Sequence, residues 1–216
     1  SNSGGFTHPS GKSVDNVKMK ILLMMLKSLY GTREERLYKK MEDLEKIVIV
    51  SNFNATLNNV AAMCSRHGWP SLRIDGSVHS SKRQQLVNQF NGKSTPFLVM
   101  LLSSKAGGVG LNLTGACRLV LLDPNWNPAT DLQAMSRIWR DGQVRPCYIY
   151  RFVCTNTVEE TIMNRQEVKD ALSFVVPERD SKMNASRIDE QELSKLFREG
   201  VCERGISSDP ASILSL

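Results

Sequence analysis

The amino-acid sequence predicts an α/β fold in which a parallel β-sheet carries helices on both of its faces. Short, continuous apolar runs occupy residues 46–53, 97–102 and 118–123. Runs of this kind are typical of strands that are buried on both sides, and such strands belong to parallel sheets. Segments with a helical pattern separate the runs, so strands and helices alternate along the chain. The crossovers between consecutive strands are expected to be right-handed.

The first 45 residues are expected to precede the sheet. Residues 1–13 are rich in Gly and Ser, which predicts a disordered segment or a linker. Residues 14–30 have a helical apolar period, and Asp15 is the candidate N-cap. Residues 31–45 alternate positive and negative side chains, which favours a solvated loop or helix extension over a binding tract. We therefore interpret residues 14–45 as an N-terminal helix with a charged connector.

The predicted sheet starts with residues 46–53, which read K-I-V-I-V-S-N-F. A helix is expected next over residues 54–67, because Gly68 would end it. A second strand over residues 71–74 leads into a helix that begins at a serine and spans residues 80–90. Each of these strand–turn–helix units is typical of a parallel α/β sheet.

A glycine-rich loop follows the next predicted strand. Residues 103–110 read S-S-K-A-G-G-V-G, with three glycines in four positions, so the backbone can approach a ligand closely. A loop of this kind after a strand can hold phosphates on its N–H groups. The loop is not a Walker A motif, because G-x-x-x-x-G-K-[ST] is absent from the whole chain. Nor does G-G-x-G match the dinucleotide-binding fingerprint.

A proline-pinned turn follows the strand over residues 118–123. It reads D-P-N-W-N-P, and Pro124 and Pro128 restrict its backbone. Trp126 lies between the prolines and is expected to pack beneath the next helix. That helix is predicted over residues 131–143, which read D-L-Q-A-M-S-R-I-W-R-D-G-Q. Pro128 suits the first turn of a helix.

The predicted helix has a polar and an apolar side, and Gly142 would end it. At about 100° per residue, Gln133, Arg137 and Arg140 fall on one face, which we expect to point outward. The opposite, buried side would hold Leu132, Ala134, Met135, Ile138 and Trp139. Two arginines one turn apart repel each other unless an anion lies near both. The pattern therefore leaves open an anion site or the solvated face of an amphipathic helix.

The C-terminal part is expected to complete the sheet. A fifth strand is predicted over residues 147–153, and a helix over residues 158–170. We therefore place the folded lobe at residues 46–175. Residues 176–216 form the expected C-terminal extension, with one amphipathic helix over residues 188–198.

Composition limits the functional classes. A chain of 216 residues fits one substantial domain with extensions. Its net charge of +6 and pI near 9.1 permit a polyanionic partner, although a merely basic protein has the same balance. No apolar run approaches the ~18 residues that cross a membrane, and no secretory signal stands at the N-terminus.

The cysteines and histidines favour neither disulfides nor a metal site. The chain has five cysteines, an odd number, without a C-x-x-C pair, which predicts reduced intracellular thiols. Its three histidines are scattered, so no zinc site is expected. The cysteines are Cys64, Cys117, Cys147, Cys154 and Cys202.

Several motifs together resemble the superfamily-two helicase-like ATPases of the Swi/Snf type, which are double-stranded DNA translocases. Residues 46–53 resemble the family's fourth motif, residues 103–113 its fifth, and residues 133–143 its sixth. The motifs occur in the family's order over residues 46–166. The same segments and Y-I-Y-R-F are most similar to the recombination-repair branch, although that branch usually has glycine in place of Asn156.

The resemblance implies a RecA-like fold, as the second lobe of a two-lobed motor. ATP would lie between this lobe and a first RecA-like lobe, which would carry the phosphate loop, the Mg²⁺ ligands and the catalytic base. Arg137 and Arg140 would act as arginine fingers, and Gln133 would help to order the site. Gly108 and Gly110 would line the ATP cleft.

The resemblance also implies partners for the glycine-rich loop. Ser103, Ser104 and Lys105 would contact DNA phosphates without sequence preference, because a translocase must move over any sequence. The full protein would be a nuclear, DNA-dependent ATPase in homologous recombination and repair, working with a strand-exchange recombinase filament or with nucleosomes. The lobe alone is expected not to hydrolyse ATP. Two alternatives are the motor lobe of a chromatin remodeller and a degenerate, non-catalytic DNA- or protein-binding lobe.

Overall fold

The computed structural model describes residues 16–37, 44–108 and 110–175. The chain divides into two compact units, residues 1–152 and 153–216. The sheet belongs to the first unit. The expected segments at 1–13 and 176–216, including the helix at 188–198, lie outside the described residues.

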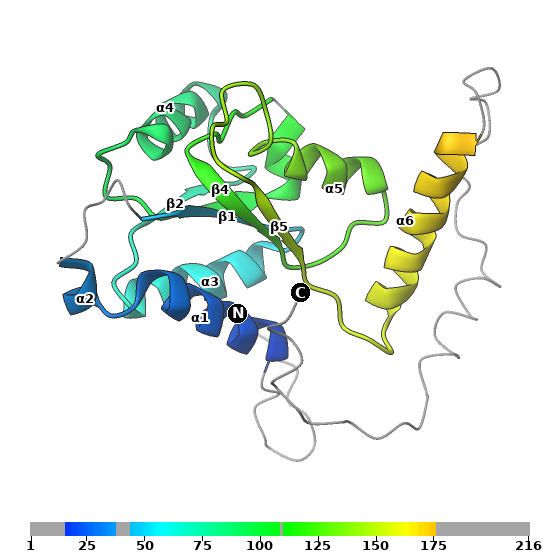
Figure 1. Ribbon diagram of the computed structural model, residues 1–216, viewed down its shortest axis with the longest axis horizontal. Coiled ribbons are helices and arrows are strands. Elements are labelled where there is room, and N and C mark those ends of the chain that lie inside the picture. The colour runs from blue at the N-terminus through cyan, green and yellow to red at the C-terminus, as the bar shows by residue number, and fades with distance from the viewer. Residues whose placement is uncertain (1–15, 38–43, 109, 176–216) are drawn as a thin grey trace, which may run out of the picture. The chain divides into compact units, whose positions relative to one another are not determined.

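A five-stranded, wholly parallel sheet forms the centre of the first unit (Figure 1). Its spatial order is β2-β3-β1-β4-β5. The parallel sheet predicted from the apolar runs is therefore confirmed. The strands are β1 (Lys46–Ser51), β2 (Ser71–Ile74), β3 (Val99–Ser103), β4 (Ala116–Leu121) and β5 (Tyr148–Arg151).

Helices cover both faces of this sheet, as the sequence predicts (Figure 1). In the first unit, α1 and α3 pack on one face, and α4 and α5 on the other. The helices of this unit are α1 (Val17–Tyr30), α2 (Arg33–Leu37), α3 (Asn54–Arg66), α4 (Ser80–Asn91) and α5 (Pro128–Met135), with a 3₁₀ segment, η2 (Ser104–Gly108).

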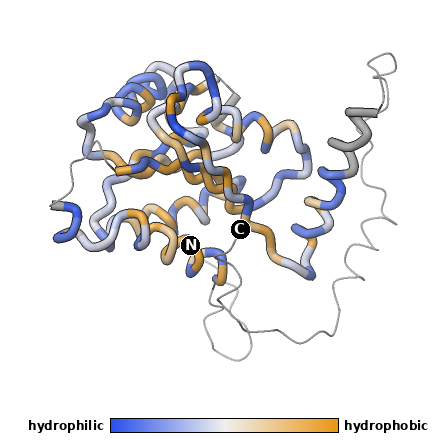
Figure 2. Tube along the Cα trace, in the orientation of Figure 1, coloured by the Kyte–Doolittle hydropathy of each residue, from blue (hydrophilic) through white to orange (hydrophobic). Residues whose placement is uncertain are grey.

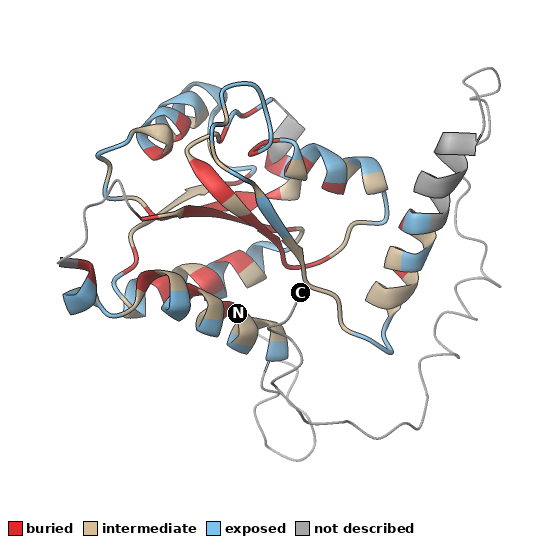
Figure 3. Cartoon of the chain, viewed as in Figure 1, coloured by how far each residue is buried: buried red, intermediate tan, exposed pale blue. Residues whose placement is uncertain are grey.

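Alternate residues of each central strand supply the two hydrophobic cores. In β1, Ile47 and Ile49 belong to the core beneath α1 and α3, whereas Val48 and Val50 belong to the core beneath α4 and α5. All six residues of β1 are buried. The central strands are apolar along their length (Figure 2) and inaccessible to solvent (Figure 3). This two-sided burial explains why the strands read as continuous apolar runs.

The N-terminal helix begins slightly later than predicted. Asn16 is its N-cap, and its Oδ1 accepts a hydrogen bond from the backbone N of Met19 at 3.4 Å. Asp15, the expected cap, lies outside the described residues. Both residue types can fill this role, so sequence could not separate two adjacent candidates.

The charged connector is less solvated than its alternating charges predict. Arg36 in α2 is only 9% exposed. Its guanidinium donates to the carbonyl oxygens of Gly68 at 2.7 Å and Gly31 at 3.2 Å. One buried arginine therefore ties the connector to the end of α3. Charge alternation could not reveal this contact, because the partners are backbone carbonyls.

The second unit contains α6 (Val158–Val175). Asn156, just before it, has a positive φ of 56°, a conformation that glycine adopts readily and asparagine tolerates. This explains why asparagine can stand where the related branch usually has glycine. Thr157 Oγ1 accepts from the backbone N of Glu159 at 3.2 Å, and Glu160 accepts from the backbone N of Asn156 at 2.6 Å.

Four cysteines lie among the described residues, and none of these four forms a disulfide there. Cys64 and Cys117 are buried, and burial raises the pKa of the Cys64 thiol to about 12. Such a thiol is inert packing material near neutral pH. Cys202 lies outside the described residues. None of the helices described here is long and apolar enough to span a bilayer.

Candidate functional site

Polar side chains gather at the edge of the sheet where its strands end. Asn52 directly follows β1, and Ser104 directly follows β3. Asp123 and Asn125 follow β4, and Arg151 is the last residue of β5. Because all the strands are parallel, these positions meet at one edge, where α/β sheets bind their ligands.

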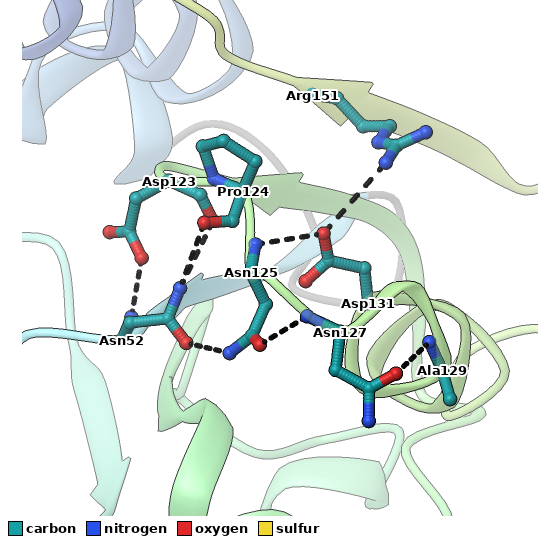
Figure 4. A network of polar contacts seen from close by, with 8 residues as sticks. All are labelled: Asn52, Asp123, Pro124, Asn125, Asn127, Ala129, Asp131 and Arg151. Carbon is teal, nitrogen blue, oxygen red and sulfur yellow. Dashed lines mark hydrogen bonds and ion pairs between the residues drawn. The ribbon is translucent and has the colours of Figure 1, made fainter. Parts of the chain in front are cut away.

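Asn52 lies at the centre of this edge (Figure 4). Its Oδ1 accepts hydrogen bonds from Ser104 Oγ at 2.5 Å and from Asn125 Nδ2 at 2.8 Å. Its Nδ2 donates to the carbonyl oxygens of Asp123 and Pro124, each at 3.4 Å. One amide therefore connects the ends of β1, β3 and β4.

Two carboxylates hold the turn after β4 in place. Asp123 accepts a hydrogen bond from the backbone N of Asn52 at 2.6 Å. Asp131, only 3% exposed, accepts from the backbone N of Asn125 at 3.1 Å and lies 3.8 Å from Arg151 Nη2 (Figure 4). A buried carboxylate needs such partners, because burying an uncompensated charge is costly.

Helix α5 begins at Pro128, three residues before the predicted span of 131–143, with this proline in the first turn, as the sequence predicts. Asn127 is its N-cap and accepts from the backbone N of Ala129 at 3.1 Å, while Pro128 occupies the first turn. Proline suits this position, because the first N–H groups of a helix have no partner within it.

The helix predicted over residues 131–143 ends much earlier, after eight residues of α5. The carbonyl oxygen of Arg137 accepts from the backbone N of Leu113 at 2.9 Å. The carbonyl oxygen of Ile138 accepts from Gln143 Nε2 at 3.1 Å. Both carbonyls are thereby engaged outside the i→i+4 pattern that would continue the helix. Periodicity alone could not reveal these contacts, because one comes from a distant residue and the other from a side chain.

The early end of α5 changes which side chains face solvent. Arg137, expected to point outward, is only 4% exposed. Leu132 and Trp139, expected to be buried, are 51% and 74% exposed. Gln133 and Arg140 are exposed, as predicted. The remaining apolar positions are buried or partly buried, as predicted: Ala134, Met135 and Ile138.

The two arginines therefore occupy different environments. Burial, and next the positive charge of Arg140, lowers the pKa of Arg137 below the ordinary value for arginine. Arg140 Nη1 lies 3.4 Å from the carbonyl oxygen of Gly110, to which it donates. Gly110, predicted to line the ATP cleft, and Arg140, predicted to act as an arginine finger, thus lie in contact. A Cβ at Gly110 would lie 3.4 Å from Arg140 Nη1, so a side chain there would be in van der Waals contact with the guanidinium.

The three residues predicted to contact DNA differ in accessibility. Ser103 ends β3 and is only 4% exposed. Ser104 is partly buried, and its hydroxyl is engaged with Asn52. Lys105 is exposed. Lys105 is thus the exposed residue of the three, and the two serines shape the loop beneath it.

Helix α4 holds the 3₁₀ segment in place. Arg83 Nη1 donates to the carbonyl oxygen of Ala106 at 3.1 Å. The Nε of Arg83 donates to the carbonyl oxygen of Val78 at 2.8 Å. Gly108, the other predicted cleft residue, is the last residue of η2, and residue 109 lies outside the described part of the chain.

Sequence reasoning missed part of this edge. Trp126 does not pack beneath α5, because 48% of it is exposed. The linking roles of Asn52 and Asp131 were also missed. The available signal for Asn52 was its place as one of the first polar residues after a buried strand, but such a position does not identify the partner.

Metal binding has no support among the described residues. In this part of the chain, no group of three or more His, Cys, Asp or Glu side chains is placed so that it could hold a metal ion. The carboxylates at the strand edge are already engaged by backbone N–H groups and Arg151.

The chain is similar to known proteins over most of its length. Residues 26–142 match the helicase conserved C-terminal domain. The chain is 43% identical over 198 residues to the DNA repair and recombination protein RAD54 of rice (Oryza sativa subsp. japonica), which covers 90% of this chain and 19% of the relative. It is 48% identical over 158 residues to human RAD54B, which covers 73% of this chain and 17% of the relative. The chain thus spans about a fifth of the length of these relatives.

A solved structure has the same fold. The C-terminal part of the Fun30 ATPase domain matches with a TM-score of 0.57 and 28% identity, covering 73% of this chain and 52% of that one. The match supports a RecA-like lobe, with the parallel sheet and two helical layers described above. The sheet, the motif order and these relatives together show that the chain belongs to the helicase C-terminal domain family, in the recombination-repair branch of the Swi/Snf-type superfamily-two proteins.

Proposed function

We propose that this chain is the second RecA-like lobe of an ATP-driven motor that moves along double-stranded DNA. The observation that carries the proposal is the loop after β3. This loop presents Lys105 to solvent near its start and contacts Arg140 through Gly110 near its end. One short segment could therefore meet a DNA phosphate and border an ATP site.

The ATP side of the proposal rests on two guanidiniums. Arg140 is accessible and is our main candidate for an arginine finger, which stabilises the charge that spreads over the transferred phosphoryl oxygens. Arg137 is buried, so we propose that it shapes the site and adds positive electrostatic potential near the bound nucleotide. Gln133 is exposed on α5 and would help to order the bound nucleotide. Gly108 and Gly110 would border the cleft.

Magnesium would be held elsewhere. Since no cluster of candidate ligands occurs in the described part of this lobe, its residues do not fit a resident Mg²⁺. We place the Mg²⁺ ligands, the phosphate loop and the catalytic base on the first RecA-like lobe. No step assigned to this lobe depends on the ion.

On the DNA side, Lys105 would neutralise a phosphate, and the hydroxyl groups of Ser103 and Ser104 would hold the loop. Contacts to phosphates carry no sequence information, as a motor that moves along any sequence requires.

The biological setting is proposed from the names of the relatives. The rice and human proteins are named for DNA repair and recombination, so we propose that the complete protein acts in homologous recombination in the nucleus. A recombinase filament would be its partner. A second candidate is chromatin remodelling, since a relative 46% identical over 175 residues, from Arabidopsis thaliana, is named Protein CHROMATIN REMODELING 25.

The decisive test uses the longer protein that contains both lobes. Arg140→Ala should lower ATP turnover at saturating duplex DNA by roughly 10³-fold, the scale of other arginine fingers. Arg140→Lys should not restore turnover, because an ammonium cannot reproduce the planar fork. Arg66→Ala serves as the matched control, since Arg66 is an exposed arginine at the end of α3. If Arg140→Ala keeps turnover within a few-fold of the parent, the finger assignment is wrong.

A further inference from the structure

Asn52 connects the two parts of the proposed site. On one side, its Oδ1 accepts from Ser104 Oγ at 2.5 Å, next to the exposed Lys105. On the other side, the same oxygen accepts from Asn125 Nδ2 at 2.8 Å. The loop assigned to DNA and the turn that leads into α5 therefore share one acceptor atom.

The amide of Asn52 has its full set of hydrogen bonds. A carboxamide can accept two and donate two. Here the oxygen accepts two, and the nitrogen donates to the carbonyl oxygens of Asp123 and Pro124. These bonds fix the orientation of the amide, so a shift of Ser104 or of Asn125 would strain its remaining bonds. Figure 4 draws the contacts with Asp123, Pro124 and Asn125.

The connection continues from Asn125 into α5. Asn125 Oδ1 accepts from the backbone N of Asn127, the N-cap of α5, at 3.0 Å. The backbone N of Asn125 donates to Asp131 in the first turn of α5 at 3.1 Å. A displacement at Asn52 would thus be passed to the start of the helix that precedes both arginines.

Building on the proposed function, we propose that Asn52 is a positioning residue that couples occupancy of the Ser104–Gly108 segment by DNA to the placement of the arginine segment after α5. Asn52 touches neither nucleotide nor DNA in this scheme. It sets the distance between the loop that would contact DNA and the arginine segment that would contact the nucleotide.

Two substitutions separate the two contacts of this connection, the bond between Asn52 and Ser104 and the bond between Asn52 and Asn125. Asn52→Ala removes its bonds with both Ser104 and Asn125. It should therefore raise the half-saturating duplex DNA concentration and also lower DNA-stimulated ATP turnover. Each change should be about tenfold, the scale of losing one or two hydrogen bonds. Asn125→Ala leaves the bond between Asn52 and Ser104 in place. It should lower stimulated turnover without changing the half-saturating DNA concentration.

Tyr30→Phe provides a structural control. The hydroxyl of Tyr30 lies 2.9 Å from the carbonyl oxygen of Glu45 and 3.1 Å from that of Leu98, which share its single proton, in the core beneath α1 and α3. Its loss should lower the melting temperature to an extent similar to Asn52→Ala, while DNA stimulation stays unchanged.

The measurements are made on the longer protein with both lobes, as ATP turnover against duplex DNA concentration, with melting temperatures in parallel. The inference is supported if the two asparagine variants differ in half-saturating DNA as stated. It is overturned if Asn52→Ala behaves like Tyr30→Phe, or if both asparagine variants shift half-saturating DNA equally. If the parent itself shows no DNA stimulation, the proposed function fails together with the inference.

Discussion

Arg137 and Arg140 lie three residues apart in opposite environments, which separates their contributions to stability. The 4% exposure of Arg137, and its lowered pKa, indicate that its charge is held in the lobe at an energetic cost. Arg140 is exposed and donates to Gly110. A residue retained at a cost to stability is a candidate for a functional role.

Exchanging Arg137 for an apolar side chain of similar length tests this cost. Arg137→Met should leave the free energy of unfolding unchanged or raise it by up to about 2 kcal/mol, because a buried charge is replaced by a group that needs no compensation. Arg137→Ala should lower it by about 2 kcal/mol through the cavity that remains. Chemical denaturation of the two variants compares them. Equal destabilisation would show that the guanidinium itself stabilises the lobe.

Asp75 predicts a pH dependence in the turn between β2 and α4. Its pKa is lowered, chiefly because the Ser77 hydroxyl donates to it, at 2.5 Å, with further help from Arg73 Nε at 2.7 Å. A lowered pKa in the folded state means that this stabilisation is complete above the unfolded value of about 3.9. It is lost as the pH falls through the folded pKa.

The matching variant is Asp75→Asn. It should lower the free energy of unfolding at pH 7 by about 1 kcal/mol, a modest figure because the ion pair is partly solvated. Its stability deficit should vanish as the pH is lowered from 5 towards 2, roughly the range below the unfolded carboxyl pKa. Thermal unfolding across this range provides the measurement, and a deficit independent of pH would contradict the assignment.

At the scale of elements, one side-chain amide helps to hold the segment after α5. The two N–H groups of Gln143 Nε2 are shared among the carbonyl oxygens of Ala116 at 2.7 Å, Ile138 at 3.1 Å and Thr114 at 3.3 Å. These carbonyls come from both the start of β4 and the arginine segment. Gln143 thus fixes the non-helical path that buries Arg137.

Gln143→Glu should disrupt this segment. It would place a carboxylate oxygen against the three carbonyl oxygens to which the amide nitrogen now donates, and oxygen atoms without a hydrogen between them repel. We expect a loss of about 2–3 kcal/mol in unfolding free energy, the scale of leaving buried polar groups unsatisfied. Gln84→Glu is the control: Gln84 is exposed on α4 and donates only to Asn88 among the contacts described. Urea denaturation should separate the two variants clearly. Similar losses of unfolding free energy in both would argue against a holding role for Gln143.

The elements themselves were largely predictable, because their signals are local. Strands buried on both sides, such as β1, must be continuously apolar, and Pro128 marks the start of α5. The end of α5 was not predictable, because the chain after it is held partly by a bond from Leu113 to the carbonyl of Arg137, 24 positions along the chain. Of the site, the exposed Arg140 and its neighbour Gly110 followed from motif resemblance. The link through Asn52 depends on side-chain geometry that periodicity does not contain.

At the scale of the whole lobe, the proposed DNA contact and the proposed ATP contact share one edge of the sheet. The loop between them is held from both sides, by Arg83 on the carbonyl oxygen of Ala106 and by Asn52 on the hydroxyl group of Ser104. Such a loop can present a cation at a fixed position. The chain's net charge of +6 would assist encounter with DNA at long range, but only a local contact can position the lobe.

Salt dependence distinguishes these two contributions. Binding to duplex DNA should be weak, independent of sequence and steeply weakened by salt, because each phosphate contact releases condensed counterions. Lys105→Ala should reduce the slope of log affinity against log salt concentration by about 1, the amount for one phosphate contact. Lys27→Ala removes the same charge from an exposed position on α1, beneath the opposite face of the sheet, and should leave the slope unchanged. Fluorescence anisotropy with a labelled duplex between about 50 and 200 mM salt covers the useful range. Equal slopes for the parent and Lys105→Ala would remove Lys105 from the interface, whereas equal reductions in both variants would mean that only net charge matters.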